Sequence, residues 1–157
     1  MLEGLPDHLH SRARAINDIN QPNGDGPVVV WLKSALRVHE NPAIDTAILI
    51  ADRYQKPLLI YQAIDERYPH ASLRHHNMLL DGALDLHRGC QERGLRYVLH
   101  VARANNRLSV VKSFSNSASC IITVLFPLPP WTQWVKNTAL SATSPVIEVD
   151  CHCVIPM

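Results

Sequence analysis

Apolar residues gather in five short runs along the chain, and most of the runs are rich in β-branched residues. Runs that are apolar at successive positions are typical of strands buried on both faces of a sheet. We therefore expect strands at residues 28–32, 58–61, 95–101, 120–125 and 145–149.

Between these runs, apolar residues recur at the spacing of a helix that is buried on one side. Asn41 followed by Pro42 predicts a helix start, because Asn caps free N–H groups and Pro is tolerated at the first helical position. Ser72 is the expected cap of a longer helix, and Gly94 is typical of its C-terminal end. Shorter helices are predicted around residues 108–114 and 131–135.

The predicted elements alternate from strand to helix along the chain, which indicates the α/β class. We predict a five-stranded parallel sheet with helices on both faces, a Rossmann-like arrangement with right-handed crossovers. Residues 27–157 form this domain. Residues 1–26 contain Pro and Gly breakers without a sustained apolar period, so we expect them to be a flexible leader.

Length and composition narrow the class of protein. The chain has 157 residues, 46% of them hydrophobic, which suffices for one core of ordinary domain size. Its formal net charge of +1 excludes a strongly polybasic DNA-coating protein. Because the chain has no apolar run of roughly 18 residues and no secretory signal pattern, we expect a cytoplasmic protein with no membrane partner.

Ligands of open parallel sheets bind beyond the C-terminal ends of the strands. This rule places the candidate rim in residues 33–41, 63–72, 102–106 and 126–131. These segments contain neither a G-x-G-x-x-G string nor a P-loop, which argues against NAD-dependent redox chemistry and P-loop phosphate transfer. With no G-x-S-x-G elbow and four unevenly spaced cysteines, the sequence predicts no catalytic residue, no disulfide scaffold and no metal site.

Two places on the rim carry candidate binding residues. Arg37 and Asn41 precede a helix, where a guanidinium and free N–H groups can hold an anion or a polar heterocycle. The alternative is a local network of Arg37 with Glu40 or a neighbouring carboxylate that fixes the loop. Ser72 and Arg74 begin the long helix, where they either contact a ligand or a partner domain, or form only a capped turn with Arg74 in solvent.

The three tryptophans, Trp31, Trp131 and Trp134, admit two interpretations. They form either a functional cluster, as a stacking platform or an electron-transfer path, or part of the core. Trp31 lies in a predicted buried strand and the other two are three residues apart on a helix, which favours core packing for all three.

Three strings of the sequence carry a family resemblance. They read VVVWL with LRVHENPAI (residues 28–32 and 36–44), YPHASLRH with MLLDGA (68–75 and 78–83), and PVIEVDCHCVIP (145–156). Together they resemble the N-terminal α/β domain of the DNA photolyase/cryptochrome family, and its class II CPD photolyases most closely. The resemblance runs from about Pro27 to Met157.

The resemblance implies a fold and a set of cofactors. In this family the N-terminal α/β domain often holds or borders an antenna pigment, a folate or a deazaflavin, and a larger helical domain binds FAD. The chain then corresponds to the α/β domain alone, with the helical FAD-binding domain and its catalytic residues absent. We therefore expect no DNA repair by this chain alone, and contact with DNA only through a helical flavin-binding partner.

Three hypotheses about function remain open. The first is a photolyase-related domain that holds an antenna pigment or docks to a flavin domain, with Arg37, Asn41, Ser72 and Arg74 as candidate rim residues. The second is the N-terminal part of a split or truncated light-driven CPD photolyase. The third is a generic nucleotide-binding α/β module.

Overall fold

The computed structural model describes residues 1–66, 68, 72–103 and 110–155 of the chain. Helices and strands alternate along it, as the apolar pattern predicts. In chain order they are α1 (Asp7–His10), β1 (Ala13–Ala15), β2 (Val28–Leu32), α2 (Pro42–Tyr54), β3 (Leu58–Asp65), α3 (Leu73–Glu92), β4 (Tyr97–Ala102), α4 (Val110–Ser117), β5 (Cys120–Val124), α5 (Trp131–Ser141) and β6 (Val146–Val149).

The strands form one sheet with the order β1-β6-β5-β2-β3-β4. The five strands from β2 to β6 pair in parallel, as predicted. The predicted count of five is wrong, because β1 adds a sixth strand that runs antiparallel to β6, with Ala13 opposite Val149. This strand has only three residues and no apolar run, so no periodic signal precedes it in the sequence.

The segment before β2 is part of the folded structure, in contrast to the flexible leader expected over residues 1–26. It supplies α1 and β1, and it buries Leu5 and Leu9. Arg12 donates hydrogen bonds to the carbonyl oxygens of Cys153 and Val154, at 2.7 and 3.1 Å. The segment therefore packs against the C-terminal part of the chain instead of extending into solvent.

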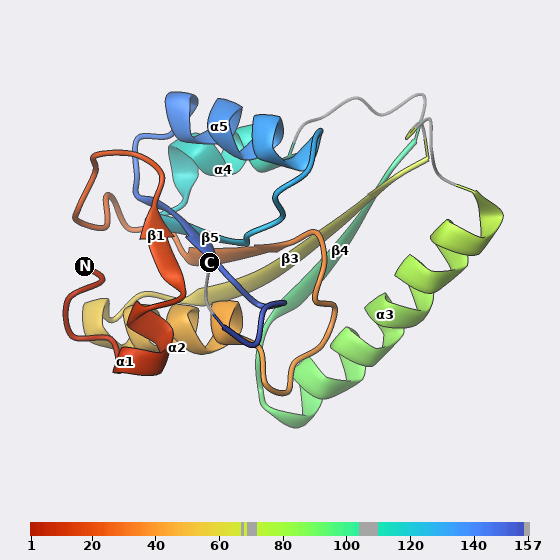
Figure 1. Cartoon of the computed structure of the whole chain (residues 1–157), viewed down its shortest axis with the longest axis horizontal. Helices are drawn as coiled ribbons and strands as arrows, with labels where there is room; N and C mark the ends of the chain where they lie inside the picture. Colours follow the sequence, from red (N-terminus) through yellow and green to blue (C-terminus); the bar gives the residue numbers. More distant parts are fainter. Residues whose placement is uncertain (67, 69–71, 104–109, 156–157) are drawn as a thin grey trace.

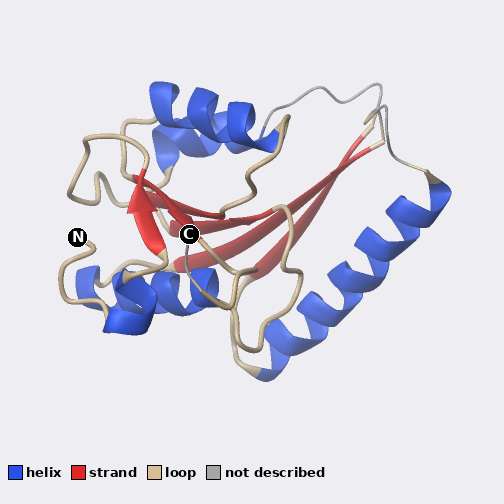
Figure 2. Ribbon diagram, viewed as in Figure 1, coloured by secondary structure: helices blue, strands red, loops and turns tan. Residues whose placement is uncertain are grey.

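Helices cover both faces of the sheet, which confirms the predicted layers (Figures 1 and 2). On the face covered by α2 and α3, Val30 and Leu32 share a core with Ile44 and Leu86. On the other face, residues of β2 and β3 share a second core with α4 and α5. All five residues of β2 are buried, as expected for a strand between two helical layers.

The path of the chain determines where the strand ends meet. β2, β3 and β4 extend the sheet in one direction, whereas β5 and β6 lie on the other side of β2. The C-terminal ends of β2 and β5 therefore adjoin at the point where the strand order reverses, which is where open α/β sheets bind ligands. Among the described helices, none has the length and apolar character needed to cross a membrane.

Candidate functional site

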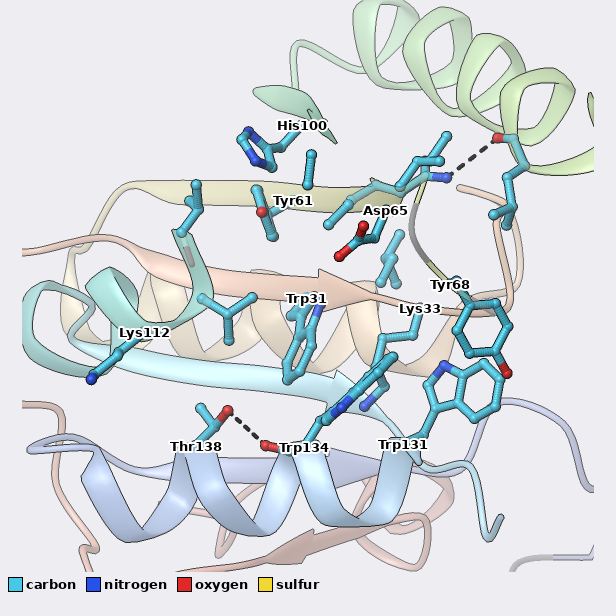
Figure 3. Close-up of a pocket in the computed structure, with 18 of the residues that line it drawn as sticks. Trp31, Lys33, Tyr61, Asp65, Tyr68, His100, Lys112, Trp131, Trp134 and Thr138 are labelled. Atoms are coloured by element: carbon cyan, nitrogen blue, oxygen red, sulfur yellow. Dashed lines mark hydrogen bonds between the residues drawn. The ribbon is translucent and has the colours of Figure 1, made fainter. Parts of the chain in front are cut away.

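A cavity of about 630 Å³ lies at the C-terminal ends of the central strands, on the sheet face covered by α4 and α5 (Figure 3). Its walls come from β2, β3, β4, α3, α4 and α5. Cavities of this size bury most of a drug-sized molecule, and this location is the expected ligand site of an open parallel sheet. We therefore take this cavity as the candidate functional site.

Aromatic rings form much of its lining. Trp131 and Trp134, three residues apart on α5, have ring centroids 5.8 Å apart, and the ring of Tyr68 lies 5.7 Å from that of Trp131. Trp31 of β2 and Tyr61 of β3 line the cavity from the sheet. Five aromatic side chains from three elements and a loop thus surround a space that suits a planar ring system.

The tryptophans divide between the two interpretations that the sequence allows. Trp31 is 7% exposed and belongs to the core between the sheet and the α4–α5 layer, as predicted. Trp134 is 41% exposed and faces the cavity, so the interpretation as core packing fails for it (Figure 3). Helical spacing cannot separate the two roles, because a cavity wall and a core face have the same period.

Lys33 brings a positive charge into this aromatic wall. It follows β2 directly, and its Nζ donates a hydrogen bond of 2.9 Å to Oγ1 of Thr123 on β5. The same Nζ lies 4.5 Å from the ring centroid of Trp31, a cation–π distance. Burial lowers the pKa of Lys33 from 10.5 to about 8, and the negative charge of Glu148 opposes this shift.

The β3, β4 and α3 side of the cavity carries further polar groups. Asp65 ends β3, and His100 lies on β4 beside Tyr61, with ring centroids 6.5 Å apart. Nε2 of His100 and Nε2 of His76 are buried without a hydrogen-bond partner among the described residues. The imidazoles are not confined to one end of the cavity, because the ring of His75 lies 6.0 Å from that of Tyr68 in the aromatic wall.

The structure gives Arg37 and Asn41 a role in fixing their own loop. Asn41 is fully buried; its Oδ1 accepts from the backbone N–H groups of Ala43 and Ile44, and its Nδ2 donates to two loop carbonyl oxygens. Arg37 donates to the carbonyl oxygen of Cys151 at 3.0 Å. Within the described part of the chain, Arg37 forms no ion pair with Glu40 closer than 4.0 Å.

Ser72 and Arg74 lie at the first turn of α3, away from the other pair. The hydroxyl of Ser72 accepts from the backbone N–H of His75 at 3.2 Å, so Ser72 is the predicted cap. Arg74 is exposed. None of the four candidates, Arg37, Asn41, Ser72 and Arg74, lines the cavity, and the structure does not bring the two pairs together there. Pro69, His70 and Ala71 of the same loop lie outside the described residues.

The predicted rim contains cavity-lining residues that are not among the four predicted candidates. Lys33, Asp65, Tyr68, Ala102 and Trp131 all fall within the predicted rim segments and all line the cavity. Their signal in the sequence was a position between the end of a strand and the start of the next helix, which is weaker than a named motif. Residues 104–106 of the rim lie outside the described residues.

The cysteines and histidines do not gather into a metal centre within the described ranges. Burial raises the pKa of Cys120 to about 12, and burial is also the main cause that raises the pKa of Cys151 to about 11. Both thiols are therefore protonated at neutral pH and are poor nucleophiles or ligands.

Comparisons with known proteins locate the chain within one family. Residues 28–157 match the family described as DNA photolyase. A deoxyribodipyrimidine photo-lyase of Methanothermobacter thermautotrophicus is 27% identical over 145 residues, which cover 88% of this chain and 32% of that protein. The corresponding protein of Potorous tridactylus is 26% identical over 130 residues, which cover 82% of this chain and 24% of that protein.

The chain thus spans no more than about a third of the length of these curated relatives. Among solved structures, a universal stress protein in complex with cAMP has a TM-score of 0.48 and 14% identity, covering 82% of this chain and all of that one.

Proposed function

Because the chain belongs to the DNA photolyase family, we propose that its α/β domain holds a planar antenna pigment, a deazaflavin or a folate, in the aromatic cavity. The observation that carries this proposal is the wall formed by Trp131, Trp134 and Tyr68 beside a space of about 630 Å³. Planar heteroaromatic rings bind between such side chains by stacking and by exclusion of water.

The residues of this chain would position the pigment. Trp131 and Trp134 offer ring faces from α5, whereas Trp31 and Tyr61 close the cavity from the sheet. Thr138 also lines the cavity from α5, and its hydroxyl donates to the carbonyl oxygen of Trp134 at 2.8 Å, which gives this buried hydroxyl a partner within the helix. A bound antenna pigment absorbs light and passes the excitation energy to a flavin.

FAD itself is not assigned to any residue here. The family resemblance assigns it to a helical domain, whereas the longer helices in the described part of the chain flank the sheet (Figure 2). This arrangement does not fit an FAD site of that kind.

A titration with two pigments tests the antenna proposal. We expect 8-hydroxy-5-deazariboflavin or methenyltetrahydrofolate to bind at one molecule per chain, with a shifted absorption band. Trp131→Ala should weaken binding by about 1–3 kcal/mol, the usual value of one stacking contact. Leu140→Ala is the matched control, because Leu140 is an exposed residue of α5 outside the cavity.

Two results would contradict the proposal. One is that neither pigment binds; the other is equal affinity of the wild type and Trp131→Ala. Thermal stabilisation by AMP or ATP without pigment binding would favour the generic nucleotide-binding module instead.

A second candidate function is docking to a helical flavin-binding domain. Three exposed leucines of α3, Leu73, Leu80 and Leu84, lie within about 40° of one another around the helix axis at 100° per residue. Exposed apolar stripes of this kind mark interaction surfaces. The relatives are three to four times as long as the matched region, so they contain further chain that can supply this partner.

Mixing experiments test the docking surface. We expect this chain to bind the isolated helical flavin domain of a class II photolyase in analytical ultracentrifugation. A Leu73→Ser and Leu84→Ser double variant should lose most of that binding, whereas Leu140→Ser should retain it. If the double variant bound as tightly as the wild type, the α3 surface would be ruled out. Light-driven dimer repair by the mixture would support the alternative of a split photolyase.

A further inference from the structure

Lys33 is a cation in an aromatic cavity, and the protein uses only part of its bonding capacity. An ammonium group has three N–H donors. One of them donates to Oγ1 of Thr123 at 2.9 Å, and the group lies 4.5 Å from the centroid of Trp31. Thr123 in turn donates its own hydroxyl hydrogen to the carbonyl oxygen of Trp31 at 2.8 Å. This network fixes Nζ on the cavity wall, and Nζ retains N–H groups that can donate to a ligand.

The described residues provide no carboxylate that pairs directly with Lys33. No Asp or Glu oxygen among them lies within 4.0 Å of its Nζ. Glu148 is the carboxylate that acts on Lys33 at longer range, but Arg14 already binds it at 2.8 Å. In Figure 3, the Lys33 side chain extends away from Asp65 toward the α5 side of the cavity.

We propose that Lys33 and Thr123 form an anion subsite of the cavity, which binds an anionic oxygen carried by a planar ring ligand. This inference rests on the proposed function. It specifies in addition that the ligand carries a negative charge and that this charge lies at the Lys33 end of the cavity. A ring stacked on Trp131 and Trp134 with its anionic oxygen at Lys33 would supply the counter-charge that the described chain does not place there. Charge-assisted hydrogen bonds of this kind are stronger than neutral ones.

Other titratable groups face the same cavity, so a change in the charge of the ligand must be distinguished from a change in the charge of these groups. They come from β3, the loop after it, α3, β4 and α4, and they are Tyr61, Asp65, Tyr68, His75, His76, His100 and Lys112. Lys33 is distinguished from them by its position between β2 and β5, beside the tryptophans. A test must therefore follow the protonation of the ligand itself.

A pair of matched pigments provides this test. The hydroxyl of 8-hydroxy-5-deazariboflavin ionises near neutral pH and its absorption band moves when it does so, whereas 5-deazariboflavin lacks this hydroxyl. We expect the wild type to bind the hydroxylated pigment about tenfold or more tightly. We also expect the pKa of the bound hydroxyl, measured from its absorption band, to fall below that of the free pigment.

Variants then assign the effect to Lys33. Lys33→Met should abolish both the affinity difference and the fall in the hydroxyl pKa, and Lys33→Arg should retain them. Lys136→Met is the matched control, because it removes one exposed positive charge from α5 outside the cavity. The hydroxyl pKa measured with the wild type needs no variant to fold.

The outcomes separate this inference from the proposed function. If both pigments bind with equal affinity and the bound hydroxyl keeps its free pKa, the anion subsite is refuted while the pigment site stands. If Lys33→Met behaves as the wild type does, another group holds the anion and the inference also fails. Absence of binding by either pigment overturns both proposals.

Discussion

At the scale of single residues, the burial of Lys33 disfavours the charged form that the proposed anion subsite requires. Its ammonium lies largely buried beside Trp31, and burial lowers its pKa from 10.5 to about 8. The folded chain therefore releases this proton at a lower pH than the unfolded chain does. Groups whose pKa is shifted by burial are common at binding sites.

Lys33 should leave a signature in the pH dependence of stability. Between about pH 8 and pH 10.5 the unfolded chain still holds the proton that the folded chain has lost, so the contribution of Lys33 to the free energy of unfolding rises with pH. We expect urea unfolding to show this rise in the difference between wild type and Lys33→Met. Parallel curves for the two proteins would contradict the account.

Asn41 shows why a candidate residue cannot be given a role from its type alone. Asn before Pro at a helix start predicts a cap, and Asn41 is that cap. The sequence could not show that the same amide also ties the carbonyl oxygens of Ala35 and Arg37, because those bonds depend on the loop conformation. The side chain of Asn41 is therefore not available to a ligand, because it is fully buried and its amide forms hydrogen bonds with the backbone of its own loop.

At the scale of elements, prediction succeeds where burial on both faces produces a continuous apolar run. All five runs form parallel strands, but β4 lies at the edge of the sheet with Val98 and Val101 exposed, so it is not buried on both faces as expected. Both predicted caps begin helices. β1 could not be predicted in the same way, because its residues form a strand only through pairing with β6. Arg14 of β1 pairs with Glu148 of β6, a contact between residues far apart in the sequence.

The helix that precedes β1 offers a direct test of whether this segment contributes to the fold. Leu9 of α1 is 3% exposed, and deletion of a buried leucine side chain costs about 2–5 kcal/mol. We therefore expect Leu9→Ala to lower the free energy of unfolding by at least about 2 kcal/mol in urea titrations. Leu140→Ala, at an exposed position, should change it by less than about 0.5 kcal/mol. Equal effects of the two variants would restore the interpretation as a flexible leader.

At the scale of the whole molecule, the sequence predicts where a ligand would bind more successfully than which residues would hold it. The rim follows from strand order, and several rim residues line the cavity. The cavity itself forms from six elements, and its depth depends on how α4 and α5 lie over the sheet. Neither property is encoded locally, so the exposure of Trp134 to the cavity and the contact of Lys33 with Trp31 are visible only in three dimensions.

The cavity is proposed to hold a planar pigment with its anionic oxygen at Lys33. A crystal structure of the chain with 8-hydroxy-5-deazariboflavin tests this most directly. We expect the ring to stack against Trp131 and Trp134, with its hydroxyl oxygen within hydrogen-bond distance of Nζ of Lys33. A pigment bound outside the cavity, or bound inside it with that oxygen directed away from Lys33, would contradict the account.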